Sequence, residues 1–335
     1  MCPAAKPRVT ENKAAILPAF VRAPAAWVLR AARAPRIALP ARFRRERVLV
    51  VGCGDVGQRL VRDRHRNGGG PRWLALTSQR EKRAALRDLG ASPLVGNLDD
   101  ARTLRRLAGL AHRIVHLAPP PGDGAYDPRT RNLLRSLRRG RLPRSVVYGS
   151  TSGVYGDCGG DWVSETRPLR ATTARARRRV DAERSVRSFP AATRASVLRI
   201  PGIYAPDREG GTPLARLQRG SPVLVAQDDV YTNHIHADDL ARACWLALWR
   251  GRARRVYNVN DDSQLRMGDY FDAAAELYGL PRPPRVSRAQ AALELSAIQM
   301  SFMSESRRLR NTRMKQELRL RLRFADPLSG LRAGH

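Results

Sequence analysis

The sequence predicts an α/β protein with a doubly wound parallel sheet and a smaller C-terminal lobe. Short apolar runs alternate with helix-like segments from residue 46 onward, which is typical of a parallel sheet covered by helices. The first run, residues 48–51, is rich in β-branched valine and leads directly into a Gly-x-Gly-x-x-Gly pattern. The chain has 335 residues, of which 42% are hydrophobic, enough for one large domain and a smaller companion.

The glycine pattern predicts a Rossmann fold and a dinucleotide site. Its glycines suit a tight turn, close approach of a pyrophosphate and packing of a helix on the sheet. Residues 59–66 continue as a helix, whose start would offer unpaired N–H groups and a positive dipole end to a phosphate. Six residues of the turn are therefore expected to bind the cofactor: Gly52, Cys53, Gly54, Asp55, Val56 and Gly57.

Six further apolar runs are expected to complete the sheet: residues 72–77, 93–96, 113–118, 145–148, 195–200 and 255–259. Helices are expected between them. One should cover residues 81–89 and end at Gly90, and another should reach Leu110 with Asp99 and Asp100 at its N-terminus.

This order of elements predicts the domain organisation. Residues 46–200 should form the Rossmann domain, with residues 233–260 returning to it, while residues 201–232 and 261–330 should form a substrate lobe. Residues 1–45 are different, with six prolines and ten basic residues against a single acid. Their composition resembles a transit peptide but has no signal-type apolar core, so we expect a disordered Arg/Ala/Pro-rich extension.

The net charge of +32 comes from 62 basic and 30 acidic residues. Such a field attracts anions, including nucleic acid and membrane surfaces. The arginines are, however, spread over nearly every expected helix, and aromatic residues make up only 6% of the chain. This dispersion weighs against a nucleic-acid partner and favours a small-molecule substrate, including an anionic one.

The four cysteines lie far apart with no Cys-x-x-Cys spacing, which indicates neither a zinc site nor a disulfide framework. This usage fits a reducing cytoplasm. The longest apolar stretch, residues 243–249, is far shorter than the roughly eighteen residues that span a bilayer. We therefore expect a cytoplasmic protein without a membrane partner, for which a homodimer is an open alternative to a monomer.

The end of the second expected strand indicates the choice of cofactor. Proteins specific for NAD usually place an acid there to hold the ribose hydroxyls. This chain instead reads Thr-Ser-Gln-Arg at residues 77–80, and hydroxyl and guanidinium groups suit a 2′-phosphate. We expect NADP, with NAD as the alternative and with Ser78 and Arg80 as ligands; a second interpretation makes these residues ordinary solvated loop residues.

Four ordered motifs together resemble the extended short-chain dehydrogenases, the NAD-dependent epimerase/dehydratase family. They are S-T-S-G-V-Y-G at residues 150–156, L-R-I-P-G-I-Y at 198–204, H-I-H-A-D-D-L at 234–240 and Y-N-V-N-D at 257–261. The glycine turn, L-A-P-P-P at residues 117–121 and S-F-M-S-E-S-R at residues 301–307 resemble most an atypical bacterial branch, often called YeeZ-like.

The resemblance implies roles for further residues. Thr151 falls at the family's catalytic Ser/Thr, four residues before Tyr155. The remaining implied positions belong to the cofactor site: Asn97 and Leu98 beside the adenine, Leu117 and Ala118 near the ribose, and Pro201 and Ile203 on the nicotinamide side.

The chain departs from the family at its acid/base pair. No Tyr-x-x-x-Lys occurs anywhere, and alignment on residues 180–183 puts Arg175 at the tyrosine and Arg179 at the lysine. Arginine can bind a ribose or phosphate but cannot act as an acid or base near neutral pH. Two functions stay open. One is an NAD(P)-dependent oxidoreductase or epimerase/dehydratase with catalytic Thr151 and Tyr155; the other is a non-catalytic NADP-binding sensor or regulatory protein.

A metal site is a further candidate at His234-x-His236-x-Asp238. Because this segment leads from a strand into a helix, Asp238 is more naturally an N-cap, and no metal is expected.

Overall fold

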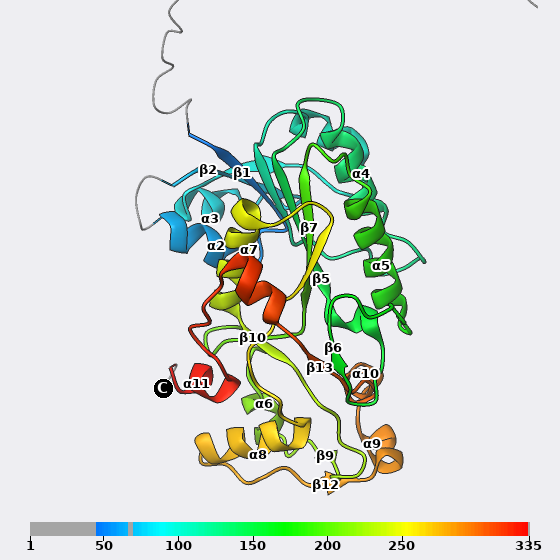
Figure 1. The fold of residues 1–335 in the computed structure, drawn as a ribbon. Helices are drawn as coiled ribbons and strands as arrows, with labels where there is room; N and C mark the ends of the chain where they lie inside the picture. The colour runs from blue at the N-terminus through cyan, green and yellow to red at the C-terminus, as the bar shows by residue number, and fades with distance from the viewer. Residues whose placement is uncertain (1–44, 66–69, 334–335) are drawn as a thin grey trace, which may run out of the picture. The chain divides into compact units, whose positions relative to one another are not determined.

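The computed structural model describes residues 45–65 and 70–333, and the expected N-terminal extension lies outside them apart from Arg45. The described residues contain a seven-stranded parallel sheet in the order β11-β7-β5-β4-β1-β2-β3 (Figure 1). Its strands are β1 (Arg47–Val51), β2 (Arg72–Thr77), β3 (Ala91–Val95), β4 (Arg113–His116), β5 (Ser145–Thr151), β7 (Arg194–Ile200) and β11 (Arg255–Asn258). This order confirms the doubly wound parallel fold.

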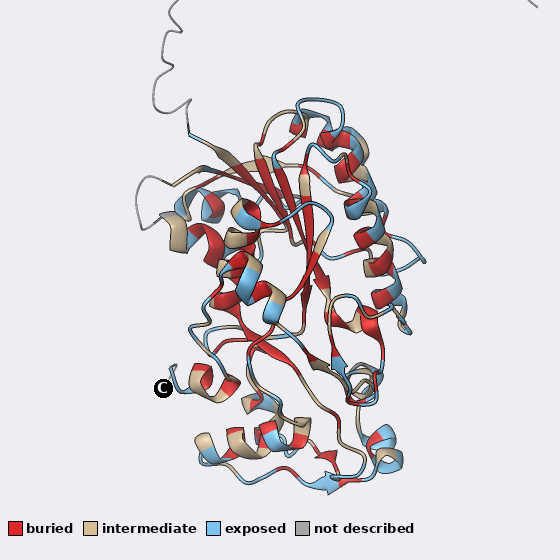
Figure 2. Cartoon of the chain, viewed as in Figure 1, coloured by how far each residue is buried: buried red, intermediate tan, exposed pale blue. Residues whose placement is uncertain are grey.

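Helices cover both faces of the sheet. One face carries α2 (Asp55–His65) and α7 (Ala237–Arg250), and the other carries α4 (Pro128–Leu137) and α5 (Ala174–Arg187). Figure 2 shows the strands buried between these layers.

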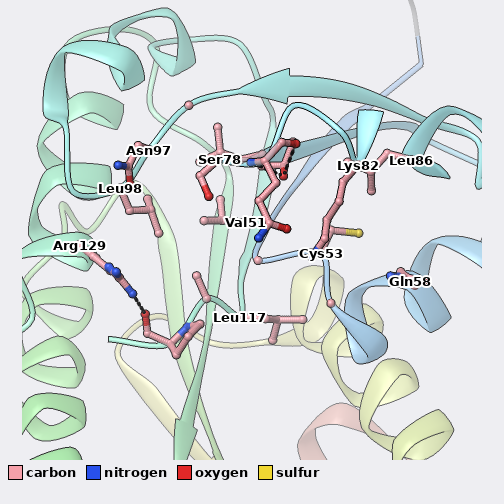
Figure 3. Close-up of a pocket in the computed structure, with 18 of the residues that line it drawn as sticks. Val51, Cys53, Gln58, Ser78, Lys82, Leu86, Asn97, Leu98, Leu117 and Arg129 are labelled. Atoms are coloured by element: carbon pink, nitrogen blue, oxygen red, sulfur yellow. Dashed lines mark hydrogen bonds between the residues drawn. The ribbon is translucent and has the colours of Figure 1, made fainter. Parts of the chain in front are cut away.

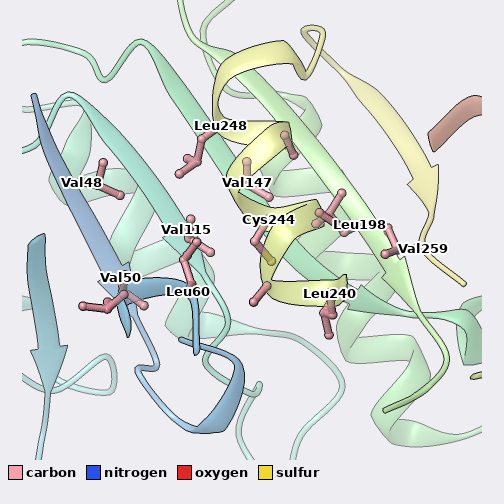
Figure 4. Packing of buried hydrophobic residues seen from close by; sticks show 14 of the residues in the cluster. Val48, Val50, Leu60, Val115, Val147, Leu198, Leu240, Cys244, Leu248 and Val259 are labelled. Atoms are coloured by element: carbon pink, nitrogen blue, oxygen red, sulfur yellow. The ribbon is translucent and has the colours of Figure 1, made fainter. Parts of the chain in front are cut away.

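Alternate residues of each strand supply the two cores. Val48 and Val50 of β1 pack with Leu60 of α2 and Leu248 of α7 (Figure 4), whereas Leu49 lies in the cluster on the other face. Strands buried on both faces are near-continuous apolar runs, which is why the sequence locates them well.

Two local expectations were wrong. The helix expected to reach Leu110 is a 3₁₀ helix, η1 (Ala101–Leu107), and it ends before Leu110. Asp100 caps its N-terminus by accepting a hydrogen bond from the N–H of Arg102. The cap of α7 is His236, whose Nδ1 accepts from the N–H of Asp238. Asp238 is instead free to bind a side chain elsewhere, and it pairs with Arg59.

The segments outside the sheet contain short elements. These are α3 (Arg83–Asp88), η2 (Ser152–Tyr155), β6 (Trp162–Val163), β8 (Gly202–Tyr204), α6 (Leu214–Gln218), β9 (Val223–Leu224), β10 (His234–His236), α8 (Met267–Leu277), β12 (Arg285–Val286), α9 (Arg288–Glu294), α10 (Ala297–Met303), β13 (Arg308–Leu309), η3 (Met314–Leu318) and α11 (Pro327–Arg332). A separate hydrophobic cluster joins Tyr204, Leu217, Val223, Tyr270 and Phe271. The predicted substrate lobe would have its core here.

Candidate functional site

A pocket of about 780 Å³ lies at the carboxyl edge of the sheet, beside the glycine turn (Figure 3). Its walls come from the turn after β1, the end of β2 and the segments after β3 and β4. Eight residues that the sequence assigns to the cofactor line it: Gly52, Cys53, Gly54, Ser78, Asn97, Leu98, Leu117 and Ala118. Segments far apart in the sequence therefore converge on one cavity of the size that small ligands occupy.

The three glycines of the turn have different steric roles. Gly52 has φ +80°, and a Cβ there would lie 2.4 Å from the backbone N of Ala118, so no side chain fits. A Cβ on Gly57 would meet Val50 Cγ1 at 3.1 Å, where α2 packs on β1. A Cβ on Gly54 would meet nothing within 4 Å. Gly54 therefore leaves its backbone open to a ligand, as a dinucleotide fingerprint requires.

The other three residues of the turn, Asp55, Val56 and Gly57, are not among those that line the cavity, and their contact with the cofactor stays a prediction. The Asp55 carboxylate is bound by Arg59 Nε at 2.9 Å and Arg208 Nη1 at 2.6 Å. Burial raises the pKa of the Cys53 thiol to about 11, so this cysteine is no nucleophile near neutral pH.

Polar groups without a carboxylate occupy the end of β2. Thr77 Oγ1 accepts from the N–H of Gln79 at 3.1 Å and fixes the turn in which Ser78 lies. Ser78 and Lys82 line the pocket, whereas Arg80 is exposed and does not. Sequence reasoning did not assign Lys82 to the cofactor site, although a cation soon after this strand could have indicated a phosphate ligand.

An ion pair closes another part of the pocket wall. Arg129 of α4 binds Asp99 through two hydrogen bonds, of 2.7 and 2.8 Å, and Arg129 Nη1 also donates to the carbonyl of Pro119 at 3.3 Å. The guanidinium lowers the pKa of Asp99. This pair joins segments 30 residues apart, and no sequence pattern indicated it.

The two residues expected to be catalytic lie outside the wall of this pocket. Thr151 ends β5, is partly exposed, and accepts from the N–H of Gly153 at 3.2 Å. Tyr155 is 1% exposed, and its hydroxyl donates to Asn258 Oδ1 at 2.6 Å. Burial raises the pKa of Tyr155 to about 12. Catalysis by these residues stays a prediction.

Arg179, at the position of the family's lysine, reaches the end of β5. Its Nη1 donates to the Gly149 carbonyl at 2.6 Å and to the Tyr148 hydroxyl at 3.1 Å. Arg175, at the position of the tyrosine, is exposed, with its guanidinium over the ring of Phe302.

The nicotinamide-side positions and Arg179 are not part of the 780 Å³ cavity. Pro201 and Ile203 lie around the start of β8, and Ile203 packs against the main hydrophobic core. Their predicted contacts with the cofactor would lie beyond the cavity wall.

Glu305 is a charged residue near Thr151 that sequence reasoning did not assign a role. A Cβ on Gly153 would lie 3.8 Å from Glu305 Oε2. The carboxylate accepts from Arg307 Nη1 at 2.8 Å and from the Thr172 hydroxyl at 3.3 Å. The S-F-M-S-E-S-R motif that contains Glu305 was the available signal, but its place beside β5 depends on the fold.

The histidine motif holds two buried rings. Burial lowers the pKa of His234 to about 4, and it also lowers the pKa of His236. Over the described ranges, no group of three or more His, Cys, Asp or Glu side chains is arranged to hold a metal. Within the same ranges, no helix has the length and apolar character needed to cross a membrane.

A pocket at the carboxyl edge of a doubly wound sheet, lined by the glycine turn after the first strand, is the arrangement found in Rossmann-type nucleotide-binding proteins. The chain belongs to the NAD dependent epimerase/dehydratase family, whose model matches residues 48–260. No curated protein sequence matches the chain.

Solved structures agree with this assignment. A functionally unknown conserved protein from Silicibacter pomeroyi is 32% identical, with a TM-score of 0.72 over 86% of this chain and 97% of its own. UDP-glucose 4-epimerase from Thermotoga maritima, solved with UDP-glucose, is 18% identical, with a TM-score of 0.68 over 85% and 96%. MoeE5, solved with UDP-glucose and NAD, is 21% identical, with a TM-score of 0.66 over 85% and 96%. The last two show likeness of fold.

Proposed function

We propose that the chain binds NADP and is an oxidoreductase or epimerase/dehydratase acting on a small carbonyl or nucleotide-sugar substrate. The observation that carries the cofactor choice is the end of β2, where Ser78 and Lys82 line the pocket, residues 77–80 contain no acid, and Glu81 is not among the lining residues. A carboxylate there would repel a 2′-phosphate, whereas a hydroxyl and an ammonium group bind it. Arg80 is an additional candidate ligand from the same turn.

The residues fit the cofactor in two further respects. Gly54 lines the cavity with an open backbone, and α2 begins at the next residue, so unpaired N–H groups of its first turn would be available to a phosphate. Asn97 and Leu98 would hold the adenine, and Leu117 and Ala118 the adjoining ribose. When bound, the cofactor would supply hydride transfer; the protein would supply binding, orientation and exclusion of water.

For the chemical step, we propose that Thr151 donates a hydrogen bond to a substrate carbonyl or hydroxyl. Arg179, fixed against β5, would hold the nicotinamide ribose in place of the family's lysine. Tyr155 is the proposed proton donor. That role requires its hydroxyl to break its hydrogen bond to Asn258 and to form one with the substrate. Glu305 is close enough to the Thr151 turn to contact a substrate bound there.

A nucleotide-sugar substrate is supported by the UDP-glucose bound in two structures of the same fold. Its pyrophosphate would also match the arginine-rich composition. The proposal includes a cytoplasmic location, in keeping with the widely spaced cysteines, and a homodimer, which sedimentation would measure.

A non-catalytic NADP-binding role is the second candidate. Arg175 and Arg179 at the tyrosine and lysine positions favour it, because neither can exchange a proton near neutral pH. Turnover separates the two functions. Purified protein with NADP or NADPH should convert a member of a panel of UDP-sugars, aldehydes and ketones, followed by nicotinamide absorbance and by NMR for epimerisation. Tight NADP binding with no turnover across the panel would favour the sensor.

A further inference from the structure

Asp55 places a negative charge at the start of α2, directly after the open backbone of Gly54. A helix N-terminus at this position is where a pyrophosphate binds, so a bare carboxylate there would repel the ligand. Two guanidinium groups offset the charge. Arg59 Nε donates to Oδ1 at 2.9 Å, and Arg208 Nη1 donates to Oδ2 at 2.6 Å.

The two arginines are held very differently. Arg59 has 8% of its side chain exposed and also binds Asp207 at 2.5 Å and Asp238 at 2.8 Å, so it is fixed on three sides. Arg208 comes from the segment after β8, 153 residues away from Asp55. Its side chain is 29% exposed, and within residues 45–65 and 70–333 Asp55 is the side chain that its guanidinium binds. Arg208 can therefore leave Asp55 at little cost to the rest of the structure.

We propose that Arg208 is a cofactor-binding residue that exchanges Asp55 for the pyrophosphate when a dinucleotide binds. A guanidinium binds phosphate through two parallel N–H groups, which is stronger and more directional than a single contact. Because Arg208 belongs to the segment after β8, the exchange couples cofactor binding to the predicted substrate lobe. The inference rests on the proposed dinucleotide binding.

The ligands that separate this role from a structural one differ in their phosphates. NADP and ADP contain the pyrophosphate, whereas adenosine 2′-monophosphate carries only the phosphate at the adenosine end. Calorimetric titration of Arg208→Ala should show about ten- to a hundredfold weaker binding of NADP and ADP, the range for a charged hydrogen bond. Binding of adenosine 2′-monophosphate should stay within about twofold. Arg208→Lys, which keeps the charge without the planar group, should be intermediate.

Arg219→Ala, an exposed arginine of the following segment, is the matched control and should bind all three ligands as the parent protein does. Unchanged binding of ADP by Arg208→Ala, or equal weakening of all three ligands, would overturn the inference while leaving the proposed cofactor intact. A lower melting temperature with unchanged ADP affinity would make the Asp55 contact structural. Failure of the parent protein to bind NADP, NAD or ADP would instead overturn the proposed function, and this inference with it.

Discussion

The glycine turn and the end of β5 keep very different shares of the family's pattern. At the turn, Gly52, Gly54 and Gly57 each meet the steric demand of a dinucleotide fingerprint. At β5 and α5, arginines stand at the tyrosine and lysine positions. The comparison teaches that binding a dinucleotide and transforming a substrate depend on different properties. Binding needs backbone shape, which glycine supplies, while transformation needs particular titratable groups.

Thr151→Val tests the end of β5, where we place the chemical step, and should have the largest effect on turnover. Valine keeps the shape of the side chain but cannot donate a hydrogen bond. Turnover should fall by about a hundred- to a thousandfold, the usual result of losing one transition-state donor, while NADP affinity stays nearly constant. Thr166→Val, at an exposed threonine outside the site, is the control. Full turnover by Thr151→Val would move the chemistry elsewhere.

Gly54→Val tests the glycine turn, where we place dinucleotide binding. The new side chain meets no protein atom at its Cβ, so circular dichroism and the melting temperature should be unchanged. It would occupy the space of the pyrophosphate, and a steric conflict of about 1–3 kcal/mol should weaken dinucleotide binding about ten- to a hundredfold. Gly122→Val, also at an open position, should bind normally. Normal binding by Gly54→Val would refute the role of this turn.

Tyr155→Phe separates a structural tyrosine from a catalytic one. Removing the hydroxyl leaves buried Asn258 Oδ1 without this donor, which should lower the free energy of unfolding by about 1–3 kcal/mol. Denaturant unfolding measures the loss. If Tyr155 also donates the proton, turnover should fall as far as in Thr151→Val. Unchanged turnover with lower stability would leave it a purely structural residue.

Charge reversal at the end of β2 should have the smallest effect. Lys82→Glu should weaken NADP binding about tenfold with little change for NAD, because the ammonium group lines the pocket. Arg80→Glu should reverse the NADP preference if Arg80 binds the phosphate, and should do nothing if its exposed position persists in the complex. Arg87→Glu on α3 is the control. Equal losses for NADP and NAD would argue against a phosphate contact.

The features predicted well from the sequence are those that depend on neighbouring residues. The strand at residues 48–51 and the glycines after it follow one another directly, so the turn and its pocket could be located. The 3₁₀ form of η1 and the capping of α7 by His236 were missed because local patterns rank cap residues without seeing the packing around them.

The features that were missed are long-range. Arg129 meets Asp99, Arg208 meets Asp55 and Glu305 approaches Gly153 only because the fold brings distant segments together. The hydroxyl of Tyr155 likewise donates to Asn258, 103 residues away. No periodicity or spacing in the sequence encodes such pairs, and they occur both beside the cofactor pocket and around the end of β5.

The most direct test of the account is a calorimetric titration of NADP and of NAD into the purified parent protein. The account predicts binding of both at one site, with NADP the tighter ligand because Ser78 and Lys82 face the pocket where a carboxylate would otherwise repel the 2′-phosphate. Equal or tighter binding of NAD would contradict the proposed cofactor, and no binding of either would contradict the central claim that this pocket holds a dinucleotide.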